Sequence, residues 1–234
     1  MAQLNPTVSA IENLTSALNK QIIPNSEYLL HGSVLDEHAE VLLHRLRGLC
    51  DSTENPIEMF NDSEMCFSLR ASTSGQIGAP QPLILKVRKS LKHPDMPWHL
   101  RYIGLPELGD KNQPTIVRTC IDVACNSNIV EFLTELGFRL EYEYVLNGFI
   151  FRKGKMKATV SKLFRPNISK AGDGIETSAG TPFSSSYLVE LSVLAHGQDK
   201  AVGEDMKTFA DQLRPLVNLE KTDYKRLAAP PGFQ

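Results

Sequence analysis

The sequence has few of the features that mark secreted, membrane-spanning or nucleic-acid-binding proteins. Its 234 residues include only four cysteines and one tryptophan, and 25 basic and 27 acidic residues leave a net charge of −2. No apolar run approaches the roughly 20 residues that cross a bilayer, and the first residues lack a basic segment followed by an apolar one. A near-neutral chain has no overall field that would gather nucleic acid. These absences predict a soluble protein of a reducing compartment.

The four cysteines lack the spacing of a metal site or a redox pair. Cys50, Cys66, Cys120 and Cys125 form no Cys-x-x-Cys motif. Cys120 and Cys125 are an odd number of residues apart on one predicted strand, so their side chains point to opposite faces. We therefore expect buried free thiols.

The motifs of the common enzyme classes are also missing. There is no His-Glu-x-x-His and no Gly-x-Ser-x-Gly, and Gly172-Asp173-Gly174 is not followed by the Lys-Ser/Thr of a phosphate-binding loop. No histidine has a cysteine or carboxylate partner at metal-ligand spacing; the six are His31, His38, His44, His93, His99 and His196. The sequence therefore predicts no catalytic, cofactor-binding or metal-binding residues.

Apolar spacing predicts mostly strands with three helices. Apolar residues three and four apart indicate helices at 39–49, 128–136 and 202–216. The middle helix has an apolar face of Ile129, Phe132, Leu133 and Leu136, with Asn128 and Glu131 at the separation of a capping box. Alternating or continuous apolar runs indicate strands at 27–32, 65–69, 83–88, 98–102, 117–123, 138–145, 149–153, 155–164 and 187–195.

The order of these elements predicts the architecture. Runs of strands are interrupted by single helices, which is not the strict alternation of a parallel doubly wound sheet. We expect an α+β fold, mainly antiparallel, in which about eight or more strands close or nearly close a barrel flanked by about three helices. Asn147-Gly148 and Lys153-Gly154 are typical turn residues of tight hairpins.

The composition predicts one domain with loose ends. Residues 26–227 would form the barrel domain, preceded by a mobile arm at 1–25. The segment 166–182 is rich in glycine and small polar residues and is expected to be a disordered surface loop. Residues 228–234 contain Pro230-Pro231-Gly232 and are expected to be an unstructured tail.

One pair of carboxylates has strand spacing. Glu141 and Glu143 share a face of their strand, opposite Leu140, Tyr142 and Tyr144. Acids inside a barrel would hold a divalent cation and act on a phosphorylated substrate, as in the triphosphate tunnel enzymes. That function needs rows of inward basic residues, which the first strand does not suggest, so a solvated strand face is the favoured interpretation.

Two further features bear on partners. The basic cluster at 152–157 would contact phosphate, but it lies at a predicted hairpin turn, where solvated charge is usual. Trp98 opens a strand and is expected in the core, with a partner interface as the alternative. Apolar residues opposite the main apolar rows of their strands suggest that a helix or another subunit covers the outside of the barrel; they are Ile84, Ile103, Leu188 and Leu194.

Four sequence blocks resemble the family of Mediator complex subunit 18 of animals. They are Glu27-Tyr-Leu-Leu-His-Gly-Ser-Val-Leu-Asp36 with His44-Arg-Leu-Arg-Gly-Leu-Cys-Asp51, Pro97-Trp-His-Leu-Arg-Tyr-Ile-Gly104 with Gly109-Asp-Lys-Asn112, Phe149-Ile-Phe-Arg-Lys-Gly154, and Tyr187-Leu-Val-Glu-Leu-Ser192 with Leu216-Val-Asn-Leu-Glu-Lys221. The blocks run from Glu27 to Lys221, and the resemblance is taken to cover residues 27–227.

The resemblance implies a helix-flanked antiparallel barrel in the nucleus, without enzyme activity or cofactor. It implies a place in the Mediator head module, pairing with subunit 20, contact with a carboxy-terminal helix of subunit 8, and indirect support of RNA polymerase II transcription. It marks no partner-binding residues. The alternatives are a metal-dependent phosphohydrolase of the triphosphate tunnel type using Glu141 and Glu143, and a nucleic-acid binder using Lys153 to Lys157.

Overall fold

The computed structural model describes residues 25–51, 57–69, 82–106, 113–171, 174–197 and 199–222. The predicted arm, apart from Asn25, and the predicted tail at 228–234 lie outside these residues. The described strands are β1 Asn25–Leu35, β2 Met59–Leu69, β3 Leu83–Ser90, β4 Trp98–Pro106, β5 Ile116–Cys125, β6 Arg139–Lys153, β7 Met156–Ala171, β8 Gly174–Pro182 and β9 Ser186–Ala195. The described helices are α2 Asp36–Leu49, α3 Ile129–Glu135 and α4 Lys200–Asp211.

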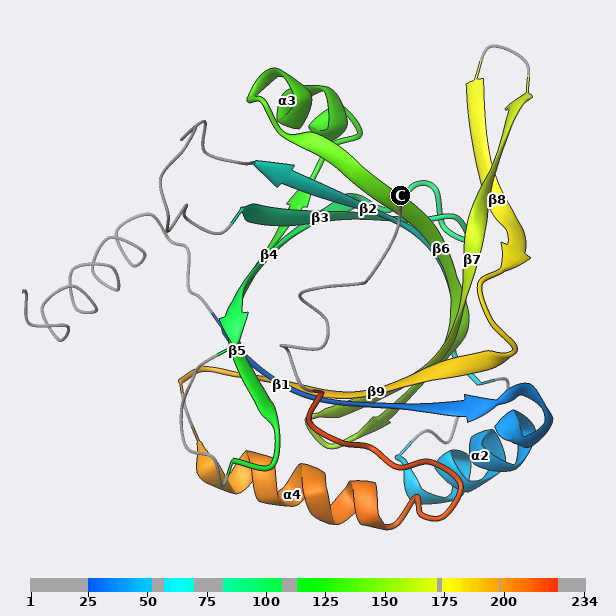
Figure 1. The fold of residues 1–234 in the computed structure, drawn as a ribbon, viewed down its shortest axis with the longest axis vertical. Helices are drawn as coiled ribbons and strands as arrows, with labels where there is room; N and C mark the ends of the chain where they lie inside the picture. The colour runs from blue at the N-terminus through cyan, green and yellow to red at the C-terminus, as the bar shows by residue number, and fades with distance from the viewer. Residues whose placement is uncertain are drawn as a thin grey trace, which may run out of the picture.

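Eight of the nine described strands close into an antiparallel barrel, as Figure 1 shows. The order around the sheet is β6-β2-β3-β4-β5-β1-β9-β7, and pairing of β6 with β7 closes it. The remaining strand, β8, pairs only with β7 at the outside of this ring. Closure leaves no free edges among the eight strands. The predicted α+β barrel with three flanking helices is confirmed.

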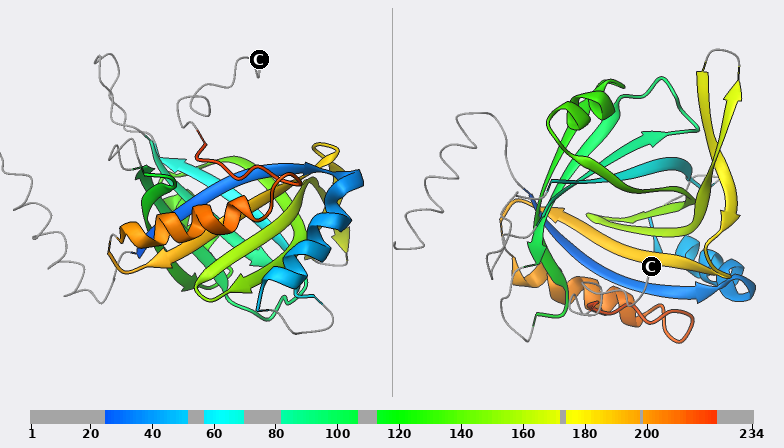
Figure 2. Two further views of the ribbon diagram at one scale, coloured as in Figure 1. Left: turned by 90° about the horizontal axis from the view of Figure 1, so that it is seen from below. Right: turned by 45° about the horizontal axis from the view of Figure 1, so that its top comes forward.

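Helices α2 and α4 cover the outside of the barrel on one side (Figures 1 and 2). In α2 the buried residues Ala39, Leu42 and Leu46 repeat at helical spacing. Helix α4 begins at the cap residue Asp199, whose carboxylate accepts a hydrogen bond from the Ala201 amide at 2.9 Å. Both helices pack on the outward apolar rows of the neighbouring strands, including Val189 and Leu191 of β9.

The main core therefore lies between the barrel wall and the helices, not inside the barrel. It joins the outward side chains of β1, β7 and β9 to α2, α4 and the segment after α4. A second cluster lies beneath α3, where Ile129 and Leu133 contact Met65, Phe67 and Val87. Trp98 packs half-buried against this cluster, with the ammonium of Lys89 5.1 Å from its ring centre. This agrees with the expected core position of the tryptophan.

Helix α3 is shorter and more exposed than predicted. Asn128 precedes it but makes no side-chain capping bond, so the capping box is wrong. Ile129 and Leu133 are buried, whereas Phe132 and Leu136 are 52% and 54% exposed. Only half of the predicted apolar face therefore meets the barrel.

Asn147-Gly148 is not a turn. Strand β6 runs through both residues without interruption. Gly148 is needed for another reason: a Cβ atom there would lie 2.4 Å from the Val160 carbonyl oxygen of β7. The missing side chain lets the two strands approach closely. The predicted turn at Lys153-Gly154 is confirmed, because Gly154 has a φ of +54° and Lys153 pairs with Met156.

The structure also differs from the predicted disordered loop at 166–182. Strand β7 continues to Ala171 and β8 pairs with it antiparallel, forming a hairpin that projects beyond the barrel (Figure 1). Pairing in a hairpin uses backbone groups, so the scarcity of apolar side chains did not prevent it. No helix among the described residues is long and apolar enough to span a membrane.

Candidate functional site: the charged lumen of the barrel

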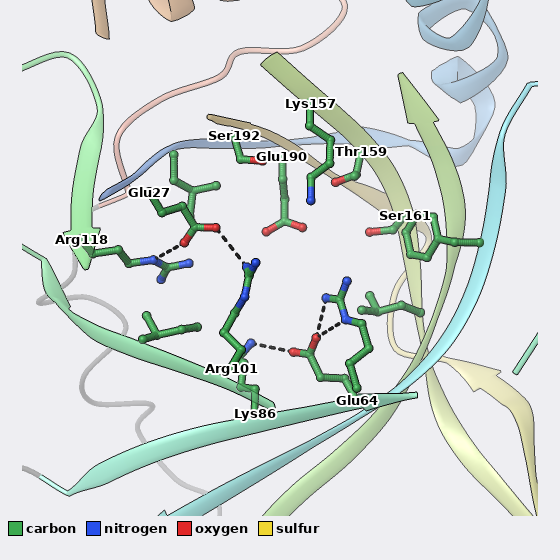
Figure 3. Close-up of a pocket in the computed structure, with 15 residues that line it drawn as sticks. Glu27, Glu64, Lys86, Arg101, Arg118, Lys157, Thr159, Ser161, Glu190 and Ser192 are labelled. Atoms are coloured by element: carbon green, nitrogen blue, oxygen red, sulfur yellow. Dashed lines mark hydrogen bonds and ion pairs between the residues drawn. The ribbon is translucent and has the colours of Figure 1, made fainter. Parts of the chain in front are cut away.

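The inside of the barrel is lined by polar and charged side chains (Figure 3). They occupy alternate positions of strands whose other positions carry the outward apolar core. The cavity has a volume of about 110 Å³. Its polar lining comprises Glu27, Glu64, Lys86, Arg88, Arg101, Arg118, Lys157, Thr159, Ser161, Glu190 and Ser192.

Glu64 of β2 is the centre of the first charged cluster. Its carboxylate accepts a hydrogen bond from Lys86 Nζ at 2.7 Å and from Arg88 Nε at 2.9 Å, both on β3. The hydroxyl of Tyr144 on β6 also donates to it. Burial disfavours the charged carboxylate, but Arg88 and Lys86 outweigh burial and lower the pKa of Glu64 to about 2. Glu64 is therefore ionised at neutral pH.

Glu27 of β1 is the centre of the second cluster. It accepts from Arg118 Nε at 2.7 Å and from Arg101 Nη1 at 3.1 Å. Arg101 also holds Asp122 with two bonds of 2.6 and 2.8 Å. The chain β1–β5–β4 is thus linked across its inner face by charge-assisted hydrogen bonds.

On the opposite wall, β9 and β7 contribute less completely paired groups. Glu190 of β9 lies 3.2 Å from His31 Nε2, and its pKa is lowered because the His31 hydrogen bond and charge outweigh the burial that would raise it. Lys157, Thr159 and Ser161 occupy alternate positions of β7 and point into the lumen (Figure 3). Burial and the nearby Arg101 and Arg88 lower the pKa of Lys157.

Glu141 and Glu143 do not line this cavity. Glu143 accepts a hydrogen bond from Ser63 at 2.9 Å, and Glu141 accepts one from Ser68. Tyr144, on the other face of the strand, has its hydroxyl on Glu64 inside the barrel. The two carboxylates suggested for metal chemistry are therefore placed away from the inward cations, and neither touches them.

The basic cluster at 152–157 is split by the hairpin. Arg152 pairs with Glu58 at 3.2 Å, and the Lys153 ammonium lies 4.8 Å from the Phe209 ring centre. Lys157 turns into the lumen instead. These residues do not form one basic surface of the kind that a nucleic-acid contact requires.

The cysteines are free among the described residues, with Cys66 and Cys120 buried. Burial raises the pKa of the Cys50 and Cys120 thiols to about 11. Both thiols are therefore protonated at neutral pH, and neither is a reactive nucleophile.

The sequence interpretation missed the lumen because it assigned the two faces of the strands the wrong way round. The apolar rows were taken as inward, and Ile84, Ile103, Leu188 and Leu194 as outward. Ile103 in fact lines the lumen, and Leu188 and Leu194 alternate with Glu190 and Ser192 on the inner side of β9. The signal was present: β3, β4, β5, β7 and β9 each carry a charged residue between two apolar ones.

The lumen is lined by charged groups, but they are a poor set of ligands for a divalent cation. Glu27, Glu64 and Glu190 each already accept hydrogen bonds from cationic or imidazole groups. No three His, Cys, Asp or Glu side chains of the described residues are arranged to hold a metal ion. The arrangement pairs the carboxylates with groups on neighbouring strands and leaves donor groups, chiefly of β7, facing the cavity.

Comparison with known proteins establishes the family. The family model described as Med18 protein matches residues 26–228. A relative from Aedes aegypti named Mediator of RNA polymerase II transcription subunit 18 is 51% identical, covering 96% of this chain and 97% of its own. One of the same name from Drosophila melanogaster is 52% identical over 95% of this chain and 98% of its own. The chain belongs to the Med18 protein family.

A solved structure shows the same fold. A chain in the structure of the Schizosaccharomyces pombe Mediator head module superimposes with a TM-score of 0.61 and 14% identity, covering 84% of this chain and 98% of that one. The curated relatives are named as a subunit of a transcription complex and not as enzymes, which confirms the prediction that this chain is not an enzyme.

Proposed function

We propose that this chain is a non-catalytic scaffold subunit of the Mediator head module that acts in the nucleus and supports regulated RNA polymerase II transcription. Membership of the Med18 protein family carries the proposal, together with relatives that match almost end to end under the name of a Mediator subunit. The shared fold with a chain of a Mediator head module supports the place within the complex.

Its expected partners are Mediator subunit 20, as a heterodimer, and the carboxy-terminal helix of subunit 8. The rigid barrel suits such a role, because a closed ring presents fixed surfaces with few free edges. RNA polymerase II would be reached through other subunits. No membrane and no sequence-specific nucleic acid is expected among the partners.

The exposed face of α3 is a suitable contact surface for one of these partners. Phe132 and Leu136 are four residues apart, so they share one side of the helix, and both are more than half exposed. The opposite side of the same helix is buried through Ile129 and Leu133. A short helix with apolar residues on both sides gains most by being covered on both.

Co-purification tests the proposal directly. The chain would be expressed with tagged subunit 20 and the subunit 8 helix, and the mass of the purified complex would be measured. A one-to-one-to-one complex is expected. Failure of the intact, folded chain to bind either partner would reject the partner assignment.

A paired variant tests the α3 surface. Phe132→Asp with Leu136→Asp should weaken association at least tenfold, which is about 1.4 kcal/mol of binding free energy. The matched control is Glu131→Gln with Glu135→Gln, which changes charge on the same helix but leaves the apolar pair. Equal binding by both variants would place the interface elsewhere on the barrel.

A further inference from the structure

The lumen cation Lys157 has no carboxylate in direct contact with its ammonium group among the described residues. Among the described residues no hydrogen bond or ion pair reaches its ammonium group, although Glu190 and Glu27 lie close enough to act on it through charge. The cations that act on it through charge, Arg101 and Arg88, are held by carboxylates of their own. A half-buried cation that faces other cations is expensive to keep unless an anion compensates it.

A second, independent feature lies on the same strand. Ser161, four residues beyond Lys157 and two beyond Thr159, is 1% exposed. Its hydroxyl Oγ is buried and has no hydrogen-bond partner. Buried hydroxyls are nearly always satisfied, so an orphan aimed into a polar cavity points to a group that belongs there. Figure 3 shows the Lys157 ammonium and the Thr159 and Ser161 hydroxyls on the same wall of the lumen.

The pairing of the other charged residues in the lumen indicates the sign of the charge on the missing group. Glu64 is held by Lys86 and Arg88, Glu27 by Arg101 and Arg118, and Glu190 accepts from His31. In an adjoining hollow that Asp62 and Asp122 line, Asp122 is held by Arg101, and Asp62 lies 4.0 Å from Arg88. Each of these carboxylates has a partner, and the unpaired groups are an ammonium and a hydroxyl. The ammonium can only donate and is positively charged, and the hydroxyl is able to donate, so an acceptor with negative charge would satisfy both.

The size of the space decides the class of ligand. The cavity of about 110 Å³ holds a few waters or one tetrahedral oxyanion. It shares Glu64, Lys86, Arg88 and Arg101 with a wider hollow of about 420 Å³, which Asp62, His99 and Asp122 also line. This second hollow gives the ligand a route in and room for a longer anion.

We propose that the lumen of this barrel is a binding site for a phosphate oxyanion, held by Lys157 and Ser161 of β7 with the inner guanidinium groups of Arg88 and Arg101 opposite. The proposal is independent of the scaffold function, since binding inside the barrel leaves its outer surface unchanged. No bond is made or broken. The bound anion would stabilise the folded chain by binding only to it.

The test is binding of sodium orthophosphate and of tripolyphosphate to the purified chain in a phosphate-free buffer with a chelator, at constant ionic strength set by sodium chloride. Calorimetry and thermal unfolding are the two readouts. The structure predicts one saturable site per chain and a rise in Tm with ligand. A preference for orthophosphate indicates a free ion, whereas a preference for tripolyphosphate indicates a phosphate group of a longer molecule that extends into the wider hollow.

Variants locate the site. Lys157→Met keeps the volume of the side chain but removes its charge, and it should weaken binding at least tenfold while leaving the Tm of the ligand-free chain equal or higher. Ser161→Ala should weaken binding several-fold and serves as the second variant if Lys157→Met does not fold. Lys155→Met, at the exposed hairpin turn on the same strand pair, is the matched control and should bind like the unaltered chain.

Three outcomes would overturn the proposal. They are the absence of saturable binding of either phosphate compound, an equal loss of affinity in Lys155→Met and Lys157→Met, and a stabilisation by phosphate that sodium chloride reproduces at the same ionic strength. If the unaltered chain binds phosphate but binds neither subunit 20 nor the subunit 8 helix, the scaffold function is rejected and the phosphate site is retained.

Discussion

The outer and inner faces of the same barrel strands are stabilised by different forces. On β9 the outward residues Val189, Leu191 and Val193 lie in the main apolar core against the helices. The inward residues Glu190 and Ser192 line a polar cavity. The outer face gains stability from burial of apolar area, whereas the inner face depends on each charge finding its partner. The same strand thus packs in the apolar core with its outer face and lines the polar cavity with its inner face.

Large-to-small changes on the outer face should have the largest effect. Phe151 is fully buried in the main core, so Phe151→Ala should lower the free energy of unfolding by about 3–5 kcal/mol. Chemical denaturation monitored by circular dichroism would measure it. Leu194→Ala, at a position 44% exposed, is the control and should change stability by less than about 0.5 kcal/mol. Similar losses at both positions would contradict the assignment of the core to the outer face.

Breaking the inner charge cluster should lower the free energy of unfolding somewhat less than Phe151→Ala does. Glu64→Gln leaves Arg88 and Lys86 without their shared carboxylate and should lower the free energy of unfolding by about 2–3 kcal/mol. The same denaturation experiment measures the loss. The double variant Glu64→Gln with Lys86→Met removes a charge of each sign and should recover part of it. A double variant less stable than the single one would mean that Lys86 has no role in holding Glu64.

The same carboxylate predicts how stability changes with pH. The folded pKa of Glu64, about 2, lies below its ordinary value of 4.5. The contribution of its ionised form is therefore complete above about pH 4.5 and is lost as the pH falls towards 2. The stability difference between the unaltered chain and Glu64→Gln should shrink across this window. A difference that stays constant from pH 6 to pH 2 would show that Glu64 is not ionised in the folded chain.

Breaking the exposed ion pair between Arg152 and Glu58 should have the smallest effect on stability. Arg152 and Glu58 are both about half exposed, and water screens their attraction. Arg152→Gln should lower the free energy of unfolding by less than about 0.5 kcal/mol. A loss comparable with that of Glu64→Gln would remove the distinction between inner and outer charges.

Several elements of the fold were predictable because they depend on local patterns. Alternation along β3, β4 and β9 and the apolar spacing in α2 correctly indicated strands and a helix. Local patterns gave the wrong secondary structure where contact with a neighbouring strand determines the conformation. Asn147-Gly148 has the composition of a turn, yet it lies within β6 because β7 needs the missing side chain of Gly148. Likewise, the polar segment at 166–182 forms a hairpin through backbone pairing, which composition does not reveal.

The candidate site was the least predictable part. The charged residues of the lumen come from seven strands, and bonded partners lie as many as 91 residues apart in the sequence, as Arg118 does from Glu27. The one pair with suggestive spacing, Glu141 and Glu143, lies elsewhere. A barrel brings together one or two residues from each of many strands, so its inner cluster has no compact sequence motif.

The sequence by itself determined that this chain is an antiparallel barrel with flanking helices and that it belongs with the Mediator subunit 18 relatives, because alternation, helical spacing and family blocks are local features. It also set two unlike faces on several barrel strands, such as β3 and β9, one mainly apolar and one carrying charged residues. Only the tertiary structure decided which face lies inside. Three helices supply apolar surface to cover the outer wall, so burial of apolar area drives those rows outward and leaves the charged rows to pair with one another across the lumen.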